Sequence, residues 1–199
     1  TLDTTVIASH IGIALQTIAS RNVDPVKQVV VSVTSFETGS KAHNVIPETV
    51  HLKGTVRTLD GEVQDLTEAR MREIVDLTAR AYGGRAEIDY RRGYPVMVNS
   101  EEQTAFAAEV ASAVSGDCAD APLVMGGEDF SQFGRTDENI PGLLFWVGAV
   151  EPARYEASKD SSLPLPSLHS PFFAPDYDPT IATGVEAMTA AALELFKEG

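Results

Sequence analysis

Met125-Gly126-Gly127-Glu128-Asp129-Phe130-Ser131 is the stretch of this sequence that constrains the fold most. It follows the apolar run Pro122-Leu123-Val124, which is typical of a short buried strand. The two glycines indicate a sharp turn, and the acidic pair after them indicates the start of a helix. Backbone N–H groups at such a strand–turn–helix junction attract anions, including carboxylates. The stretch therefore predicts one wall of a binding site, whose other walls must come from elsewhere in the chain.

The composition is that of an ordinary globular protein, since 43% of the 199 residues are hydrophobic and 22% are charged. The formal net charge of −14 argues against nucleic acid or an anionic membrane as the main partner, because either would be repelled. The lone cysteine, Cys118, excludes an internal disulfide and a multi-cysteine metal site. The longest apolar stretch, Leu143 to Val150, is far too short to cross a membrane. We expect a cytoplasmic protein, and the absence of an initial methionine suggests a processed protein or a fragment.

The first ninety residues predict the order helix, strand, strand, helix, strand. Apolar spacing predicts helices over Asp3–Arg21 and Val63–Tyr82. The buried side expected for the second helix carries Leu66, Ile74, Leu77 and Ala81. β-Branched content and alternation predict strands over Val29–Val33, Thr49–Arg57 and Ala86–Tyr90. This order is that of a ferredoxin-like split βαβ unit that lacks its first strand. An open sheet edge is unfavourable, so we take the missing strand as a second sign that the native chain begins further upstream.

The remaining sequence alternates helices with strands, which predicts part of an α/β layer. We expect a helix over Ser100–Val114, short strands over Leu123–Val124 and Leu143–Val147, and then a long loop rich in Pro and Ser. A final helix carries an apolar face made of Ile181, Val185, Met188, Ala192 and Leu195.

Two histidine-bearing loops are candidate binding elements. His169 lies between the Pro/Ser-rich loop and the last helix, where a histidine serves as a metal ligand or general base, or only bonds to the backbone. His43 and Asn44 lie on a polar loop, where they can bind a carboxylate or cap the turn before Pro47.

Arg57 and the acidic pair after the glycines also have two interpretations each. Arg57, on the polar side of its strand, can form a bidentate pair with a carboxylate or belong to a solvated sheet face. Glu128 and Asp129 can be catalytic acids, or they can complement the dipole of a helix N-terminus.

Taken together and in order, these pieces resemble the M20 family of metallopeptidases and amidohydrolases. The resemblance runs from end to end and is strongest to the branch of hippurate hydrolase and the indoleacetyl-amino-acid hydrolases. It rests on His43-Asn44-Val45-Ile46-Pro47-Glu48, Gly54-Thr55-Val56-Arg57-Thr58, Arg91-Arg92-Gly93-Tyr94-Pro95, Met125-Gly126-Gly127-Glu128-Asp129-Phe130 and Leu168-His169-Ser170-Pro171.

The resemblance implies an α/β fold with an α+β lid. Residues 1–92 would form a ferredoxin-like lid and dimerisation domain, and residues 93–199 the C-terminal part of an α/β metallohydrolase catalytic domain. The family's catalytic domain carries two divalent metal ions, zinc or manganese. The expected reaction is cleavage of the amide bond of an N-acyl amino acid or a small peptide-like substrate. The expected assembly is a homodimer formed through the lid domain.

Carried over by position, the resemblance makes His169 a metal ligand. It makes Asn44, Arg57, Gly126, Gly127 and His43 substrate-binding residues. The family's other ligands and its general base precede the lid, so no catalytic base is expected within this chain. We therefore expect the isolated chain to be inactive and to bind divalent metal weakly at most.

Two other functions fit parts of the sequence. The chain can act as a non-catalytic dimerisation or binding module, with lid sheets pairing edge to edge. Alternatively, Gly126-Gly127-Glu128-Asp129-Phe130 is similar to the Gly-Gly-Asp-Glu-Phe signature of GTP-binding nucleotide cyclases, with the acids transposed. That signature needs a β-hairpin around the glycines, and the polar segment after Phe130 shows no strand alternation.

Overall fold

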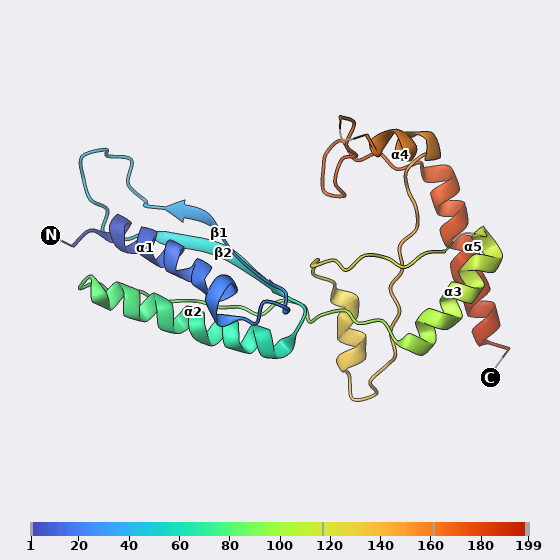
Figure 1. The fold of residues 1–199 in the computed structure, drawn as a ribbon, viewed down its shortest axis with the longest axis horizontal. Coiled ribbons are helices and arrows are strands. Elements are labelled where there is room, and N and C mark those ends of the chain that lie inside the picture. Colours follow the sequence, from blue (N-terminus) through green and yellow to red (C-terminus); the bar gives the residue numbers. More distant parts are fainter. Residues whose placement is uncertain (1, 117, 161, 198–199) are drawn as a thin grey trace. The chain divides into compact units, whose positions relative to one another are not determined.

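The computed structural model describes residues 2–116, 118–160 and 162–197. The chain divides into two compact units (Figure 1). Unit 1 comprises Thr1–Val96 together with Val124–Asp129, and unit 2 comprises Met97–Leu123 together with Phe130–Gly199. The short segment around the paired glycines is therefore packed with the N-terminal unit, although its neighbours in sequence are not.

Unit 1 begins with helix α1 (Thr4–Thr17), which continues into a π-helical turn, η1 (Ile18–Asn22). The carboxylate of Asp3 caps α1 by accepting hydrogen bonds from two backbone N–H groups of its first turn. The apolar residues that face the core recur at helical spacing and are all buried: Ile7, Ile11, Leu15 and Ile18.

Two antiparallel strands, β1 (Val29–Glu37) and β2 (His51–Thr58), form the sheet of unit 1. Val29 pairs with Thr58 and Glu37 pairs with His51, and one irregularity interrupts the register between Val33 and Ser35. The apolar side chains of one face pack on the core, which leaves the polar side chains of β2 on the other face. The predicted strands at Val29 and Thr49 are thus confirmed, and β1 is longer than expected.

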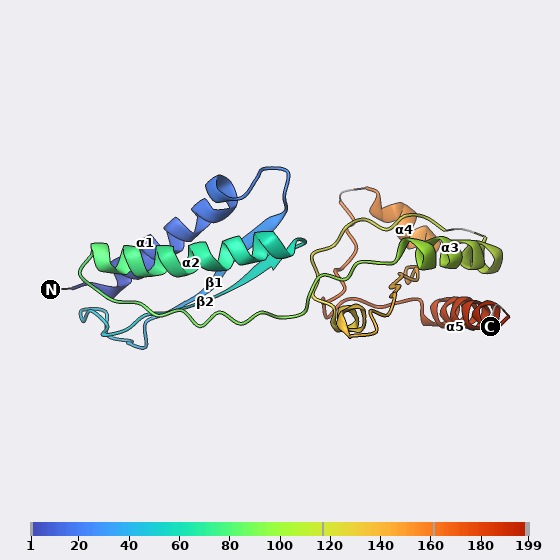
Figure 2. The same cartoon turned by 90° about the horizontal axis from the view of Figure 1, so that it is seen from below.

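Helix α2 (Gly61–Ala81) completes the core of unit 1 and is capped by Asp60. Figure 2 shows α1 and α2 on the same side of the β1–β2 sheet. The side chains that α2 buries are Val63, Thr67, Ile74, Val75 and Ala79. After Tyr82 the chain turns through Gly83, whose φ of 77° lies in the left-handed region that favours glycine.

The predicted third strand, Ala86–Tyr90, is wrong as a hydrogen-bonded element. In the part of the chain that the structure describes, the sheet has two strands, and residues 84–100 have no helix or strand assignment. Ala86 and Ile88 do pack against the core, so the alternation correctly reports burial. A strand also needs a neighbour to exchange backbone hydrogen bonds with, and this segment has none in the sheet.

Unit 2 is built from three α-helices and one 3₁₀ helix within its described residues. The helices are α3 (Glu101–Ser115), α4 (Pro152–Ser158) and α5 (Tyr177–Leu195), and η2 (Asp129–Arg135) is the 3₁₀ helix. Helices α3 and α5 pack against each other (Figure 1). Helix α4 lies where a loop was predicted, although the proline in its first turn, directly after Glu151, is a helix-start signal.

The two short strands predicted in the second half of the chain are wrong. Leu123–Val124 and Leu143–Val147 have no strand assignment; instead the side chain of Asn99 bonds both the N–H and the carbonyl of Leu144, each at 2.9 Å. Helix α5 confirms the predicted final helix, and its apolar face is exposed: Val185 and Met188 are 60% and 65% exposed. The periodicity fixes which residues share a face, but burial requires a surface to cover them.

Across its described residues, the protein has no helix that combines the length and the apolar character needed to cross a bilayer.

Candidate functional site

Arg57 lies near the end of β2, on the exposed face of the sheet, opposite Val30 of β1. Its Nη1 donates a hydrogen bond to the backbone carbonyl of Met125 at 2.6 Å. Among the described residues, Arg57 takes part in no ion pair with an acidic side chain. A guanidinium has five N–H donors, so donors remain for an anionic ligand at this position.

The segment Val124–Asp129, here called the diglycine loop, lies against unit 1 beside Arg57. A side chain added at Gly126 would meet no atom within 4 Å, and one added at Gly127 would lie 3.7 Å from Cδ2 of Tyr94. The space beside both glycines is therefore open or bordered only by an aromatic ring.

The diglycine loop differs in two ways from the junction that the sequence predicts. Gly126 and Gly127 have no turn assignment, and neither has a positive φ. The helix that follows is a 3₁₀ helix beginning at Asp129, too short for a strong dipole. The attraction of an anion must therefore come mainly from Arg57. Because η2 and not a β-hairpin follows the glycines, the structure also contradicts the cyclase-like alternative.

His43 and Asn44 lie in the loop that joins β1 to β2, and both side chains are exposed. The hydroxyl of Thr4 donates a hydrogen bond to the Pro47 carbonyl at 2.7 Å, which fixes this loop to the start of α1. The loop borders an open pocket of about 490 Å³. The pocket is lined by Thr5, Thr38, Ser40, Ala42, His43, Asn44, Val45, Ile46 and Pro47.

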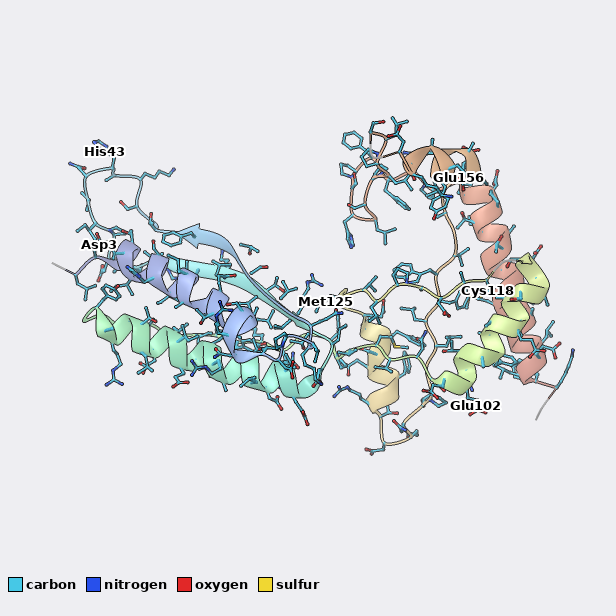
Figure 3. The ribbon with its side chains drawn as sticks, viewed as in Figure 1. Asp3, His43, Glu102, Cys118, Met125 and Glu156 are labelled. Carbon is cyan, nitrogen blue, oxygen red and sulfur yellow. The ribbon has the colours of Figure 1, made fainter. Side chains whose placement is uncertain are left out.

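The predicted substrate-binding residues fall into two groups at opposite ends of the hairpin. The loop with His43 and Asn44 precedes His51, whereas Arg57 lies six positions further along β2. At about 3.4 Å per residue, the two ends of this strand are separated by about 20 Å. Figure 3 shows His43 and Met125 at these opposite ends. In one copy of the chain, Arg57 shares its surroundings with the diglycine loop and not with Asn44.

His169 is exposed in a turn of unit 2, where the N–H of Ser170 bonds the Ser167 carbonyl at 2.9 Å. Within residues 2–116, 118–160 and 162–197, no group of three His, Cys, Asp or Glu side chains is placed to hold a metal ion. A hydrolytic zinc site needs at least three protein ligands. The described residues therefore do not by themselves fit a metal centre, and no catalytic step is assigned through one.

Tyr94 borders the diglycine loop and was not singled out from the sequence. It lies 58% exposed at the end of the extended segment that follows α2. Arg92 holds this segment to α2 through Asp65 at 2.7 Å and Glu68 at 2.8 Å. The only sequence signal was its presence in the motif Arg91-Arg92-Gly93-Tyr94-Pro95.

Glu68 is the centre of the ionic network that holds this segment. Arg72 donates to one carboxylate oxygen at 2.7 Å and Arg92 to the other at 2.8 Å. The hydrogen bond from Arg72, and then that from Arg92, lower the pKa of the Glu68 carboxyl below its ordinary value. Nη1 of Arg72 also bonds the Ile88 carbonyl at 3.4 Å. The network thereby fixes the backbone that leads to Tyr94.

The sequence description of peptidase family M20/M25/M40 matches residues 5–194. N-acetyldiaminopimelate deacetylase of Brevibacillus brevis is 36% identical over 162 residues, which are 79% of this chain and 41% of the deacetylase. Thermostable carboxypeptidase 2 of Saccharolobus solfataricus is 34% identical over 149 residues, which are 74% of this chain and 37% of that protein. The chain thus spans less than half the length of the curated relatives it matches.

One solved structure is similar along almost the whole chain. It is a Bacillus subtilis protein described as a dinuclear metal-binding peptidase of the M20 family. The TM-score is 0.72 at 25% identity, and the match covers 98% of this chain and 47% of that one. The similarity therefore extends through both unit 1 and unit 2.

Proposed function

This chain belongs to peptidase family M20/M25/M40. On that premise we propose that it forms part of a metal-dependent amidohydrolase. The proposed reaction is hydrolysis of the amide bond of an N-acyl amino acid or a small peptide-like substrate. The names of the relatives support this class, since one is an N-acetyldiaminopimelate deacetylase and another a carboxypeptidase. The finer assignment to the hippurate hydrolase branch stays a prediction.

The observation that carries the proposal is the contact between Arg57 and the diglycine loop. A guanidinium without an acidic partner among the described residues stands beside two glycines whose added side chains would meet little or nothing. In a chain with a net charge of −14, an exposed cation of this kind favours a small anion. A free carboxylate next to an amide bond is the feature that N-acyl amino acids and peptides share. Arg57 would bind it, while Gly126 and Gly127 leave room for the substrate backbone.

The proposed cofactor is a pair of divalent ions, zinc or manganese. When bound, such ions polarise a carbonyl and activate water for attack on it. His169 would supply one ligand; the other ligands and the general base belong to parts of the family fold that this sequence does not include. This chain's own proposed role is to bind and orient the substrate.

We also propose that the enzyme is a homodimer formed through unit 1. A two-stranded sheet has two free edges and is marginal alone, so edge pairing between copies would stabilise it. Dimerisation would also resolve the separation of about 20 Å between Asn44 and Arg57, because loops from two copies can approach one ligand. Light scattering should give twice the chain mass of 21.3 kDa; a strict monomer would exclude this arrangement.

The test of the proposed activity is metal removal and replacement in the enzyme that carries this sequence with the remainder of its family fold. We expect hydrolysis of N-acetyl amino acids to cease after chelation and to return with Zn²⁺ or Mn²⁺. The 199-residue chain alone serves as the comparison and should show neither turnover nor stoichiometric metal binding. Activity that persists after complete metal removal would refute the proposal.

A further inference from the structure

Two side chains of unit 1 lie next to the diglycine loop. Nη1 of Arg57 donates to the Met125 carbonyl at 2.6 Å. The ring of Tyr94 lies next to Gly127, with Cδ2 at 3.7 Å from the position that a Cβ would take. The loop has no turn, helix or strand assignment up to Glu128, so these side-chain contacts replace secondary structure in fixing it.

Both contacts come from rigid parts of unit 1. Arg57 is on β2, whose neighbouring residue Val56 packs on the hydrophobic core. Tyr94 follows the segment that is attached to α2 by the ion pair of Arg92 with Glu68 and by the hydrogen bond from Arg72 to the Ile88 carbonyl. The sheet and α2 therefore position the diglycine loop, which lies about 30 positions after Tyr94 and about 70 positions after Arg57 in the sequence.

We propose that Arg57 and Tyr94 are positioning residues that fix the diglycine loop to unit 1. Arg57 would use one N–H on the Met125 carbonyl and keep its other donors for the ligand carboxylate. One guanidinium would then set the distance between the carboxylate and the loop backbone. The ligand part of this inference rests on the proposed function; the positioning of the loop does not.

Binding both the Met125 carbonyl and the ligand carboxylate is a task that suits an arginine at position 57 better than a lysine. A planar guanidinium directs several N–H groups at fixed angles and can serve two acceptors at once. A lysine ammonium is a single point charge on a flexible stem, so it cannot hold the Met125 carbonyl and the ligand carboxylate at fixed angles at the same time. Arg57→Lys should therefore retain part of the loop order and lose part of the fixed geometry.

The test uses the 199-residue chain without substrate or metal, observed by NMR. In the unmodified chain, the amide order parameters of Gly126 and Gly127 should approach the value of about 0.85 typical of rigid backbone. In Arg57→Met they should fall below about 0.6, the range of flexible segments. The carbonyl ¹³C resonance of Met125 should move upfield, because the carbonyl is no longer polarised by a donor. Arg57→Lys should be intermediate.

Matched variants separate this effect from a general loss of structure. Lys53→Met makes the same kind of change on the same exposed face of β2 and should leave the loop unchanged. Tyr94→Leu should loosen Gly127 and abolish its ring-current shift. Tyr82→Leu removes another partly exposed tyrosine, one that stacks on His10, and should not affect the loop.

A loop that is already flexible in the unmodified chain would overturn the inference. So would unchanged order in both Arg57→Met and Tyr94→Leu, provided that α2 resonances show each variant folded. Either result would leave the hydrolase proposal standing, since that is tested by turnover and metal dependence.

Discussion

The two units of this protein contain similar amphipathic patterns but differ in what they bury. All the buried apolar side chains among the described residues lie in unit 1, between Ile7 and Ala79. In unit 2, α3 and α5 pack together, yet neither buries a residue. The difference shows that an apolar stripe becomes a core only where a sheet and a second helix cover it. We therefore expect the stability of the chain to reside in unit 1.

The largest expected effect comes from a pair of leucine truncations, one in each unit. Leu15→Ala removes a side chain that is 5% exposed in α1 and should destabilise unit 1 by about 2–4 kcal/mol. Leu193→Ala removes one that is 58% exposed in α5 and should cost less than about 0.5 kcal/mol. Hydrogen exchange of α1 and α2 reports unit 1, and fluorescence of Trp146 reports unit 2. Equal losses would contradict the comparison.

A pair of glycine substitutions compares the tightly packed β-hairpin with the open diglycine loop. A Cβ at Gly54 would lie 2.3 Å from the Ser32 carbonyl oxygen of the neighbouring strand, so Gly54→Ala must displace β1 from β2. We expect a loss of about 1–3 kcal/mol in urea unfolding. Gly126→Ala meets no atom within 4 Å and should change stability by less than about 0.5 kcal/mol. A tolerated Gly54→Ala would show that the hairpin is looser than described.

Thr67 is a polar residue in the core of unit 1 whose replacement should increase stability. Its side chain is fully buried and Oγ1 has no hydrogen-bond partner among the described residues. Thr67→Val keeps the shape and removes the unsatisfied hydroxyl, so we expect a gain of about 1 kcal/mol. Thr67→Ser keeps the hydroxyl and should instead lose about 1 kcal/mol with the methyl group. Destabilisation by Thr67→Val would mean that the hydroxyl has a partner in solution.

The smallest effect concerns acid pH. In unit 1, hydrogen bonds from Arg72 and then Arg92 lower the pKa of Glu68 below its ordinary 4.5. A carboxyl with a lowered folded-state pKa stabilises the protein above its unfolded pKa, and this contribution disappears as the pH falls through the folded pKa. The stability of unit 1 should therefore decline as the pH falls below the ordinary carboxyl pKa of 4.5. Glu68→Gln should flatten the decline, whereas Glu138→Gln in unit 2 should leave it unchanged.

The sequence predicted those parts of the fold that local periodicity determines. The face of α1, the extent of α2 and both strands of the hairpin were recognised from local spacing. The face of α2 was not, since only Ile74 of its predicted buried residues is buried, whereas Leu66 and Leu77 are exposed. Ala86–Tyr90 and Leu143–Val147 have the same apolar character, but whether they form strands depends on a neighbour that the pattern does not contain. The apolar face of the predicted final helix is likewise exposed, because spacing reports which residues share a face and not what covers them.

The site shows a similar limit. Arg57 and Met125 are 68 positions apart, so no local pattern connects them. Only the ordered resemblance to the M20 family placed Arg57 and the diglycine loop in one site. Tyr94 was missed because an exposed tyrosine in a connecting segment has no local signature of binding. The distance between Asn44 and Arg57 likewise follows from the hairpin register and not from their spacing in the sequence.

The central claim is that Arg57 recognises the carboxylate of the substrate. The direct measurement compares KM for an N-acetyl amino acid and for its methyl ester in the enzyme that carries this sequence. Arg57→Met should raise KM for the acid by about 10- to 100-fold more than for the ester, as expected for losing a hydrogen bond to a charged group. Tyr94→Leu, which only loosens the loop, should leave the ratio of the two KM values unchanged. Equal losses on acid and ester in Arg57→Met would contradict the account.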